Sequence, residues 1–321
     1  MVLGIDGGGT KTLYSVCAFD GRVHCLLRRS PIALIQCGED GLRNALRNGL
    51  RDVLREAGIP TRDRISAVCL GAPCWGESVI GDQTIRNVAD EVFGDTPVYI
   101  CNDAEIACAG SFALNPGINI VAGTGAIAFG MDAHGQTARC GGWGHFADEG
   151  SGYWLGMRTL SLFCKQADGR LPKQALYRLV RKKFGVKWDF GVIDPILEEY
   201  LPHRDKVASL QLILLEAAKQ GDTSAIESYR EAGREIALNA DGIMSKLNLK
   251  GGANVSYSGG IFKVGSLVMD SFRETLEARG CTVVQPLAPP WTGALMLALR
   301  LAGQVTPHAL GRLIEFGSKD D

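Results

Sequence analysis

The stretch Asn119–Gly156, NIVAGTGAIAFGMDAHGQTARCGGWGHFADEGSGYWLG, organises the rest of the chain. An apolar run ends in Gly-Thr-Gly at 123–125, a second apolar run follows, and residues 133–135 have the composition of a hairpin turn. Gly-Gly-Trp-Gly at 141–144 and an acidic pair at 148–149 then precede a helical stretch. Backbone exposed by glycines, one large aromatic side chain and clustered carboxylates are typical of a site that holds a polar ligand beside a phosphate.

Length and composition set the class of protein. The chain has 321 residues, enough for two domains that each bury a core. Its 46% hydrophobic and 21% charged residues are typical of a soluble globular protein. A net charge of −1 offers no electrostatic attraction to nucleic acid or to a membrane surface, so we expect neither partner.

The ten cysteines are scattered, and no two have the C-x-x-C spacing of many metal or redox sites. Most lie in apolar runs, where cysteine behaves as a small hydrophobic residue. The first residues lead straight into an apolar strand, and no apolar run reaches the roughly 18 residues of a membrane span. We therefore expect reduced cysteines in a cytoplasmic protein.

A glycine-rich hairpin opens the chain. Val2–Ile5, Leu13–Phe19 and Val23–Leu27 have the apolar composition of strands, and D-G-G-G-T-K-T at 6–12 joins the first two. This loop runs between strands, unlike a Walker A loop, which leads into a helix. Consecutive backbone N–H groups in such a loop can wrap phosphates, and the alternative is a hairpin without a ligand.

Helices and strands then alternate. Helical spacing or strand composition is found at 40–57 (helix), 65–70 (strand), 84–93 (helix), 98–101 (strand) and 104–113 (helix). Three hairpin strands followed by this alternation predict a mixed sheet covered by helices.

Asp103 follows the strand that ends at Cys101. In open α/β sheets the carboxyl ends of the strands face the ligand crevice, so Asp103 is a candidate general base for a hydroxyl nucleophile. The alternative is an aspartate that caps the following helix.

The pattern starts again after Asn115-Pro116-Gly117. Strands at 118–121 and 126–131 surround a second glycine turn, five helical segments fill 151–247, and strands near 253–257 and 282–284 alternate with helices. This repetition predicts an N-terminal domain of residues 1–114, joined by the terminal helix 305–321. A related C-terminal domain would span 115–304 with a helical insertion at 151–250.

Five motifs occur in order: D-G-G-G-T-K-T at 6–12, N-D-A at 102–104, G-T-G at 123–125, S-G-G-I at 258–261 and P-x-W-x-G-A at 289–294. Together they resemble the nucleotide-binding motifs shared by actin, sugar kinases and heat-shock chaperones. The segment C-G-G-W-G-H-x-x-D-E-G-S-G-Y-W resembles the N-acetylglucosamine kinase branch of the BadF/BadG/BcrA/BcrD ATPase family. The resemblance covers nearly the whole chain.

The resemblance implies an α/β fold of two ribonuclease-H-like (actin-like ATPase) domains with a ligand cleft between them, and ATP and Mg²⁺ as cofactors. The implied nucleotide-binding residues are Gly8, Gly9, Thr10 and Lys11 in the first phosphate loop, Gly123, Thr124 and Gly125 in the second, and Gly259 and Gly260 against the adenosine. Asp6 would hold Mg²⁺ through water, and Asp103 matches the catalytic aspartate, which also contacts the sugar.

The implied sugar-binding loop comprises Gly142, Trp143 and Gly144, with Asp148 as an acceptor for sugar hydroxyls. Alternatives for its side chains are a buried anchor for the tryptophan, a structural role for His145, and a zinc site that would use Cys140 and His145. Two features depart from the family. Ser30–Gln36 lacks the asparagine that usually contacts the sugar, and the segment after the tryptophan is one residue shorter.

The leading hypothesis is an ATP-dependent kinase for the 6-hydroxyl of N-acetylglucosamine, with glucosamine and N-acetylmuramic acid kept open. The alternative is the ATPase that activates 2-hydroxyacyl-CoA dehydratases or benzoyl-CoA reductase, which would need an iron–sulfur cluster held by cysteines. A third class is a non-catalytic sugar sensor. The resemblance also implies a homodimer.

Overall fold

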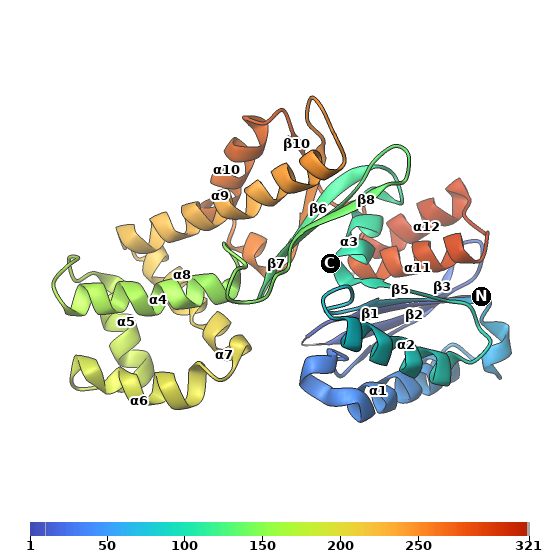
Figure 1. Cartoon of the computed structure of the whole chain (residues 1–321), viewed down its shortest axis with the longest axis horizontal. Coiled ribbons are helices and arrows are strands. Elements are labelled where there is room, and N and C mark those ends of the chain that lie inside the picture. The colour runs from blue at the N-terminus through green and yellow to red at the C-terminus, as the bar shows by residue number, and fades with distance from the viewer. Residues whose placement is uncertain (10, 320–321) are drawn as a thin grey trace. The chain divides into compact units, whose positions relative to one another are not determined.

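The computed structural model describes residues 1–9 and 11–319, and the contacts within the chain group it into two compact units (Figure 1). Unit 1 consists of residues 1–119, 129–136 and those from 285 onward, and unit 2 consists of 120–128 and 137–284. Residues 285–304 thus group with unit 1. The predicted C-terminal domain of residues 115–304 stays a prediction. In the described part of the chain, no helix combines the length and apolar character that crossing a membrane requires.

Unit 1 contains a mixed five-stranded sheet of order β3-β2-β1-β4-β5, which confirms the predicted mixed sheet. The central strand β1 pairs antiparallel with β2 and parallel with β4, and β4 pairs parallel with β5. The strands are β1 Val2–Gly7, β2 Thr12–Cys17, β3 Val23–Arg29, β4 Ala67–Ala72 and β5 Val98–Asn102.

Side chains alternate along β1 and build a core on each face of this sheet. Leu3 and Ile5 belong to the core under α1 (Leu34–Glu56) and α2 (Val79–Phe93), and Val2 belongs to the core on the other face. That second face is covered by α3 Asp103–Phe112, α11 Pro290–Leu301 and α12 Pro307–Gly317 (Figure 1). The helix α11 lies against β1 at Gly4, where a Cβ atom would come within 2.8 Å of the Leu295 nitrogen.

The second sheet repeats the strand order of the first. It runs β10-β9-β6-β7-β8, so its first strand in sequence, β6, is again central, with the next two strands on one side and the last two on the other. The strands are β6 Gly117–Ala122, β7 Ala126–Met131, β8 Thr137–Gly141, β9 Asn254–Ser258 and β10 Thr282–Val283. The repetition predicted from the two glycine turns is therefore present, and the pair of sheets is the ribonuclease-H-like arrangement that the resemblance implies.

Helices make up most of the rest of unit 2. They are α4 Gly152–Ala167, α5 Ala175–Phe184, α6 Ile193–Pro195, α7 Arg204–Ser209, α8 Gln211–Lys219, α9 Thr223–Lys246 and α10 Ser266–Glu277, with a π-helical turn at Ile196–Tyr200 and 3-10 turns at Asp189–Val192 and Gly260–Val264. One more 3-10 turn, Arg62–Arg64, lies in unit 1. The helix α9 contacts β8 and packs along α10, which contacts β10.

Two helices of unit 1 begin earlier than predicted. Residues before Asp40 already form a turn of α1, separated from the regular helix by Gly38 with φ 66°. The helix α2 begins at Val79 rather than at Thr84, because the Ser78 hydroxyl caps it by accepting the Gly81 N–H. Its first two side chains are exposed and apolar, so the helical period in the sequence starts only one turn later.

Candidate functional site

Two carboxylates meet at the carboxyl ends of the parallel strands of unit 1. Asp6 is the second-last residue of β1, and Asp103 is the first residue of α3, directly after β5. Burial raises the pKa of the Asp6 carboxyl to about 7, the negative charge of Asp103 adds to the rise, and the Lys11 ammonium opposes it. At this end of the sheet, the negative charge of Asp103 and burial together outweigh the effect of the Lys11 ammonium on Asp6.

Asn102, not Asp103, caps helix α3. Its side-chain oxygen accepts the Ala104 N–H at 3.0 Å, and its amide nitrogen donates to the Trp75 carbonyl oxygen at 3.0 Å. The asparagine thus ties the start of α3 to the loop that follows β4. Asn102 therefore has the capping role that was considered for Asp103. Sequence reasoning missed this role, although Asn102 is part of the N-D-A motif.

The glycine hairpin lies beside these carboxylates. Gly8, Gly9 and Lys11 lie between β1 and β2, and Thr10 falls outside the described residues. A Cβ atom on Gly8 would come within 2.9 Å of the Lys11 carbonyl oxygen, so the tight turn requires a residue without a side chain there. At the end of the turn Thr12 is fully buried, and its hydroxyl has no hydrogen-bond partner within the described structure.

The segment that lacks the expected asparagine passes over the end of β1. Ile32 is buried, and a Cβ atom on Gly7 would approach its side chain to 2.6 Å. Ile35 is 79% exposed. An apolar side chain, that of Ile32, therefore lies against the end of β1 in the segment where the family resemblance predicts an amide that contacts sugar.

The second glycine turn is fastened to the start of α4 within unit 2. The Gly152 N–H donates to the Gly123 carbonyl oxygen at 2.7 Å, and the Tyr153 N–H donates to the Thr124 carbonyl oxygen at 3.1 Å. A Cβ atom on Gly125 would come within 2.7 Å of a carboxylate oxygen of Asp148. A side chain at residue 125 would therefore require the Asp148 carboxylate to move.

Asp148 also organises the predicted sugar loop. Its carboxylate is buried and accepts the Trp143 N–H at 3.0 Å. Burial raises the pKa of Asp148, while hydrogen bonds from the backbone at Ala126, Gly142 and its neighbours in the loop oppose the rise. One carboxylate therefore lies against both the second glycine turn and the predicted sugar loop of unit 2.

The sugar loop presents its aromatic side chains outward. Gly142 and Gly144 have φ of 67° and 108°, conformations that favour glycine, and Trp143 between them is 76% exposed. Phe146 is 81% exposed. The tryptophan is thus not the buried anchor considered as an alternative, whereas His145 has a structural contact because its ring lies 4.8 Å from that of Tyr153.

A small hollow of about 170 Å³ lies next to this loop in unit 2. Its lining includes Asp148 and Glu149, together with Glu235 and Asn239 from α9. The last two residues were missed because they lie about ninety positions further along the chain and carry no motif. Only the packing of α9 on β8 brings them here.

Gly259 and Gly260 differ in how much room the protein leaves for a side chain. Gly259 has φ 105°, and a Cβ atom there would come within 2.2 Å of the Ala122 carbonyl oxygen, so the strand β6 itself requires this glycine. A Cβ atom on Gly260 would have nothing within 4 Å. The predicted collision of a side chain with adenosine at both positions remains a prediction. At Gly259, close packing against β6 already explains why the residue is glycine.

The described residues also bear on a possible metal site. Among the residues that the structure describes, no group of three or more His, Cys, Asp or Glu side chains is arranged to hold a metal ion. None of the ten cysteines, all of which lie in the described part of the chain, forms a disulfide bond. A Cβ atom on Gly242 would come within 2.4 Å of the Cys140 sulfur, so this cysteine packs closely against α9.

Comparison with known proteins places the chain in a family. The model of the BadF/BadG/BcrA/BcrD ATPase family matches residues 3–298. The chain is 29% identical over 279 residues to an N-acetylmuramic acid/N-acetylglucosamine kinase from Clostridium acetobutylicum, across 86% of this chain and 90% of the relative. It is 28% identical over 311 residues to an N-acetyl-D-glucosamine kinase from Dictyostelium discoideum, across 92% and 97%.

A solved structure of a candidate N-acetylglucosamine kinase from Chromobacterium violaceum has a similar fold. It superposes with a TM-score of 0.75 and 26% identity, over 93% of this chain and 98% of that one. The agreement confirms the predicted fold class of two actin-like ATPase units.

Proposed function

The chain belongs to the BadF/BadG/BcrA/BcrD ATPase family, and we propose that it is an ATP-dependent kinase that phosphorylates the 6-hydroxyl of an amino sugar. The observation that carries the proposal is the placement of Asp103. It lies at the carboxyl end of the sheet beside Asp6, and Asn102 takes over the capping of α3. In open α/β sheets the carboxyl ends of the strands face the crevice in which ligands bind.

Asp103 would act as the general base. Phosphoryl transfer depends on in-line positioning and charge neutralisation, and the protein has little covalent work to do. The Asp103 carboxylate would accept a hydrogen bond from the sugar hydroxyl, orient its oxygen toward the phosphorus atom, and take the proton as the new bond forms. A rigid α3 terminus, tied by Asn102 to the loop after β4, supports this orientation.

Glycine turns are the proposed contacts for ATP. Gly8, Gly9, Thr10 and Lys11 in unit 1 and Gly123, Thr124 and Gly125 in unit 2 are the proposed phosphate contacts, and Gly259 and Gly260 the proposed adenosine contacts. Backbone N–H groups in such turns bind anions, and the Lys11 ammonium adds a positive charge. The tight geometry at Gly8 supports a backbone-lined loop.

The residues of unit 1 fit a magnesium ion. Burial raises the pKa of Asp6 and the negative charge of Asp103 adds to the rise, and a nearby divalent cation would favour the ionised carboxylate against both. Asp6 would hold Mg²⁺ through water, and the bound ion would neutralise charge on the phosphates. Asp6 must be ionised for this role.

The sugar would lie against Gly142, Trp143 and Gly144, with Asp148 as the acidic residue of the wall. The exposed indole offers an apolar face for a sugar ring, and the Asp148 carboxylate holds the loop backbone in place. N-acetylglucosamine is our first choice of acceptor, supported by the names of the relatives. Glucosamine and N-acetylmuramic acid stay open because Ile32 and Ile35 occupy the segment of the missing asparagine.

The test is a coupled assay of ADP release across amino sugars, neutral hexoses and muramic derivatives. We expect sugar-dependent turnover with N-acetylglucosamine or a close relative, and little ADP release without sugar. ADP release that no sugar accelerates would overturn the proposal in favour of an ATPase. As implied by the family, we also propose a cytoplasmic homodimer.

A further inference from the structure

An apolar patch lies on unit 1 where the helices α1 and α2 begin. It consists of Ile35, Val79 and Ile80, which are 79%, 88% and 80% exposed. Val79 and Ile80 are the first two residues of α2, and Ile35 lies in the turn that opens α1. Exposed apolar side chains that gather on one surface commonly mark a binding site.

Strand directions place this patch and the two carboxylates at the same edge of the sheet. The strand β2 is antiparallel to both β1 and β3, so β3 runs in the direction of β1, as β4 and β5 do. The helix α1 follows β3, α2 follows β4, and Asp103 follows β5. The patch therefore lies at the carboxyl edge, where β1 presents Asp6 and where open α/β sheets bind their ligands.

Local contacts join the two halves of the patch to each other and to the start of α3. A Cβ atom on Gly81 would lie 3.8 Å from a methyl group of Leu34, so the first turn of α2 lies against the turn that carries Ile35. The loop between β4 and α2 includes Trp75, whose carbonyl oxygen accepts the Asn102 amide at 3.0 Å. This one loop thus connects the patch with the residue that caps α3.

The patch and Asp103 lie toward opposite faces of this edge. The helices α1 and α2 cover one face of the sheet, and α3, which begins at Asp103, covers the other (Figure 1). In a pyranose ring, the 2-position lies across the ring from the 5-position, which bears the 6-hydroxymethyl group. A sugar that lies across the edge with its 6-hydroxyl at Asp103 therefore directs its 2-substituent toward the patch.

The patch suits a neutral, apolar substituent. Residues 31–37, Pro-Ile-Ala-Leu-Ile-Gln-Cys, and residues 78–81, Ser-Val-Ile-Gly, contain no charged side chain. An ammonium group at the 2-position would lose water against these side chains and gain no counter-ion from either segment, which disfavours its binding. An acyl group at the same position would remove apolar surface from water, which favours its binding.

We propose that Ile35, Val79 and Ile80 bind the N-acyl group of the acceptor. The enzyme then prefers N-acyl amino sugars to sugars with a free amine, and binds acyl chains longer than acetyl more tightly. The inference rests on the proposed kinase function and adds the residues that select the 2-substituent. Ile35 contributes an apolar contact from the segment in which the resemblance predicts an asparagine.

The experiment varies the substituent and leaves the rest of the sugar unchanged. Glucosamine and its N-acetyl, N-propionyl and N-butyryl derivatives are compared in the ADP-release assay. We expect kcat/KM to be at least about tenfold higher for the N-acetyl sugar than for the free amine, because the ammonium group must lose water. It should then rise about two- to fourfold with each added methylene, mainly through a lower KM.

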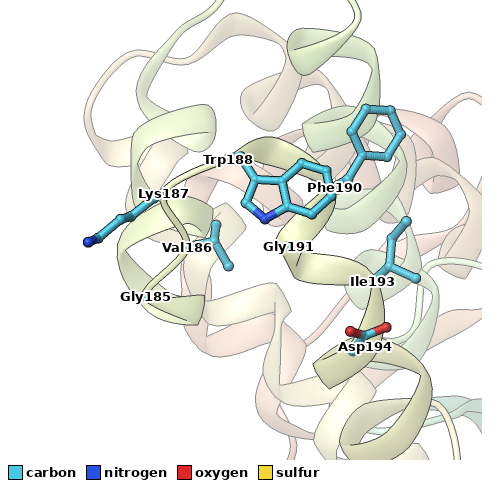
Figure 2. A pocket seen from close by; sticks show the side chains of 8 residues that line it. All are labelled: Gly185, Val186, Lys187, Trp188, Phe190, Gly191, Ile193 and Asp194. Atoms are coloured by element: carbon cyan, nitrogen blue, oxygen red, sulfur yellow. The ribbon is translucent and has the colours of Figure 1, made fainter.

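Two variants remove the apolar surface, and two controls keep it. In Ile35→Ser, and in Val79→Ser combined with Ile80→Ser, the total gain from N-acetyl to N-butyryl should fall below about twofold. Leucine at residues 79 and 80 should retain the gain. The second control is Phe190→Ser, because Phe190 is 63% exposed and lies at a hollow of unit 2 that is lined by none of the residues assigned to the reaction (Figure 2). Circular dichroism checks that every variant is folded.

The outcomes separate this inference from the proposed kinase function. Turnover of amino sugars with a kcat/KM that does not rise with acyl length would overturn the inference and leave the kinase function in place. A rise that persists in both serine variants would do the same, because the gain would then come from other residues. ADP release that none of the four sugars accelerates would overturn the kinase function, and the inference with it.

Discussion

Replacing Asp6 with asparagine should stabilise the protein and abolish its use of magnesium. Asp6 has a pKa near 7 instead of its ordinary value near 3.8, because burial and the charge of Asp103 disfavour its ionised form. A folded-state pKa above the unfolded one contributes stability that is present at low pH and is lost as the pH rises through the folded pKa. Between roughly pH 4 and pH 7, the wild-type protein therefore loses stability that an asparagine at this position would keep.

The size of the effect follows from the shift. With 1.36 kcal/mol for each pKa unit, ionising Asp6 costs about 4 kcal/mol at about pH 8 and about 1.5 kcal/mol at about pH 5. The advantage of Asp6→Asn over wild type should therefore grow by about 2–3 kcal/mol between these values, and by about half as much if water screens the partly exposed carboxylate. Comparing two pH values cancels effects of the substitution that do not depend on pH.

The assay is urea unfolding followed by circular dichroism, with a chelator present so that no divalent cation is bound. Added Mg²⁺ should stabilise the wild type at the higher pH and leave Asp6→Asn unchanged. As a matched control, Asp63→Asn neutralises an exposed carboxylate on another turn of unit 1 and should show no pH-dependent gain. An advantage of Asp6→Asn that is equal at both pH values would refute the electrostatic reasoning.

Three further substitutions test the proposed site. Asp103→Asn should keep the affinity for ATP, measured by calorimetry, while kcat falls by a factor of about 100 to 10,000 because the hydroxyl loses its base; near-normal kcat would remove Asp103 from the mechanism. Trp143→Ala should raise the sugar KM much more than the ATP KM in the ADP-release assay, because the exposed indole lies on the sugar loop; an equal rise in both would contradict that placement. Asp148→Asn should lower thermal stability by the equivalent of about 1.5–3 kcal/mol, since the loop loses hydrogen bonds to a charged acceptor, and should raise the sugar KM. Glu149→Gln, next to it and exposed, is the control, and a similar effect of the two changes would count against the hydrogen bonds as the cause.

Local signals in the sequence were enough for most of the framework. Apolar runs and short turns identified the hairpin strands of both sheets, and two glycine turns in similar surroundings predicted the repeated strand order that the structure shows. The glycines at 142 and 144 also indicated a loop, and both have a positive φ, a backbone conformation that favours glycine. These features depend on a residue and its immediate neighbours, which a sequence displays directly.

Element boundaries were less accessible. The capping of α2 by Ser78 and the turn before Gly38 involve exposed residues, so no apolar period marked them. In the same way, the choice of Asn102 over Asp103 as the cap of α3 depends on which side chain reaches the Ala104 N–H. Either residue type can cap a helix, so composition did not separate them.

By itself, the sequence determined the order of strands and helices, the places where only glycine fits a turn, and the carboxylates at strand ends. Tertiary structure alone decided which groups share an environment. The pKa of Asp6 depends on Asp103, the Asp148 carboxylate lies against Gly125, and Glu235 reaches the hollow beside the loop. Each pairing joins residues that are separated in the sequence and that only the packing of the folded chain brings together. Burial and charge act through distance in space, so the properties of these residues exist only once the chain is folded.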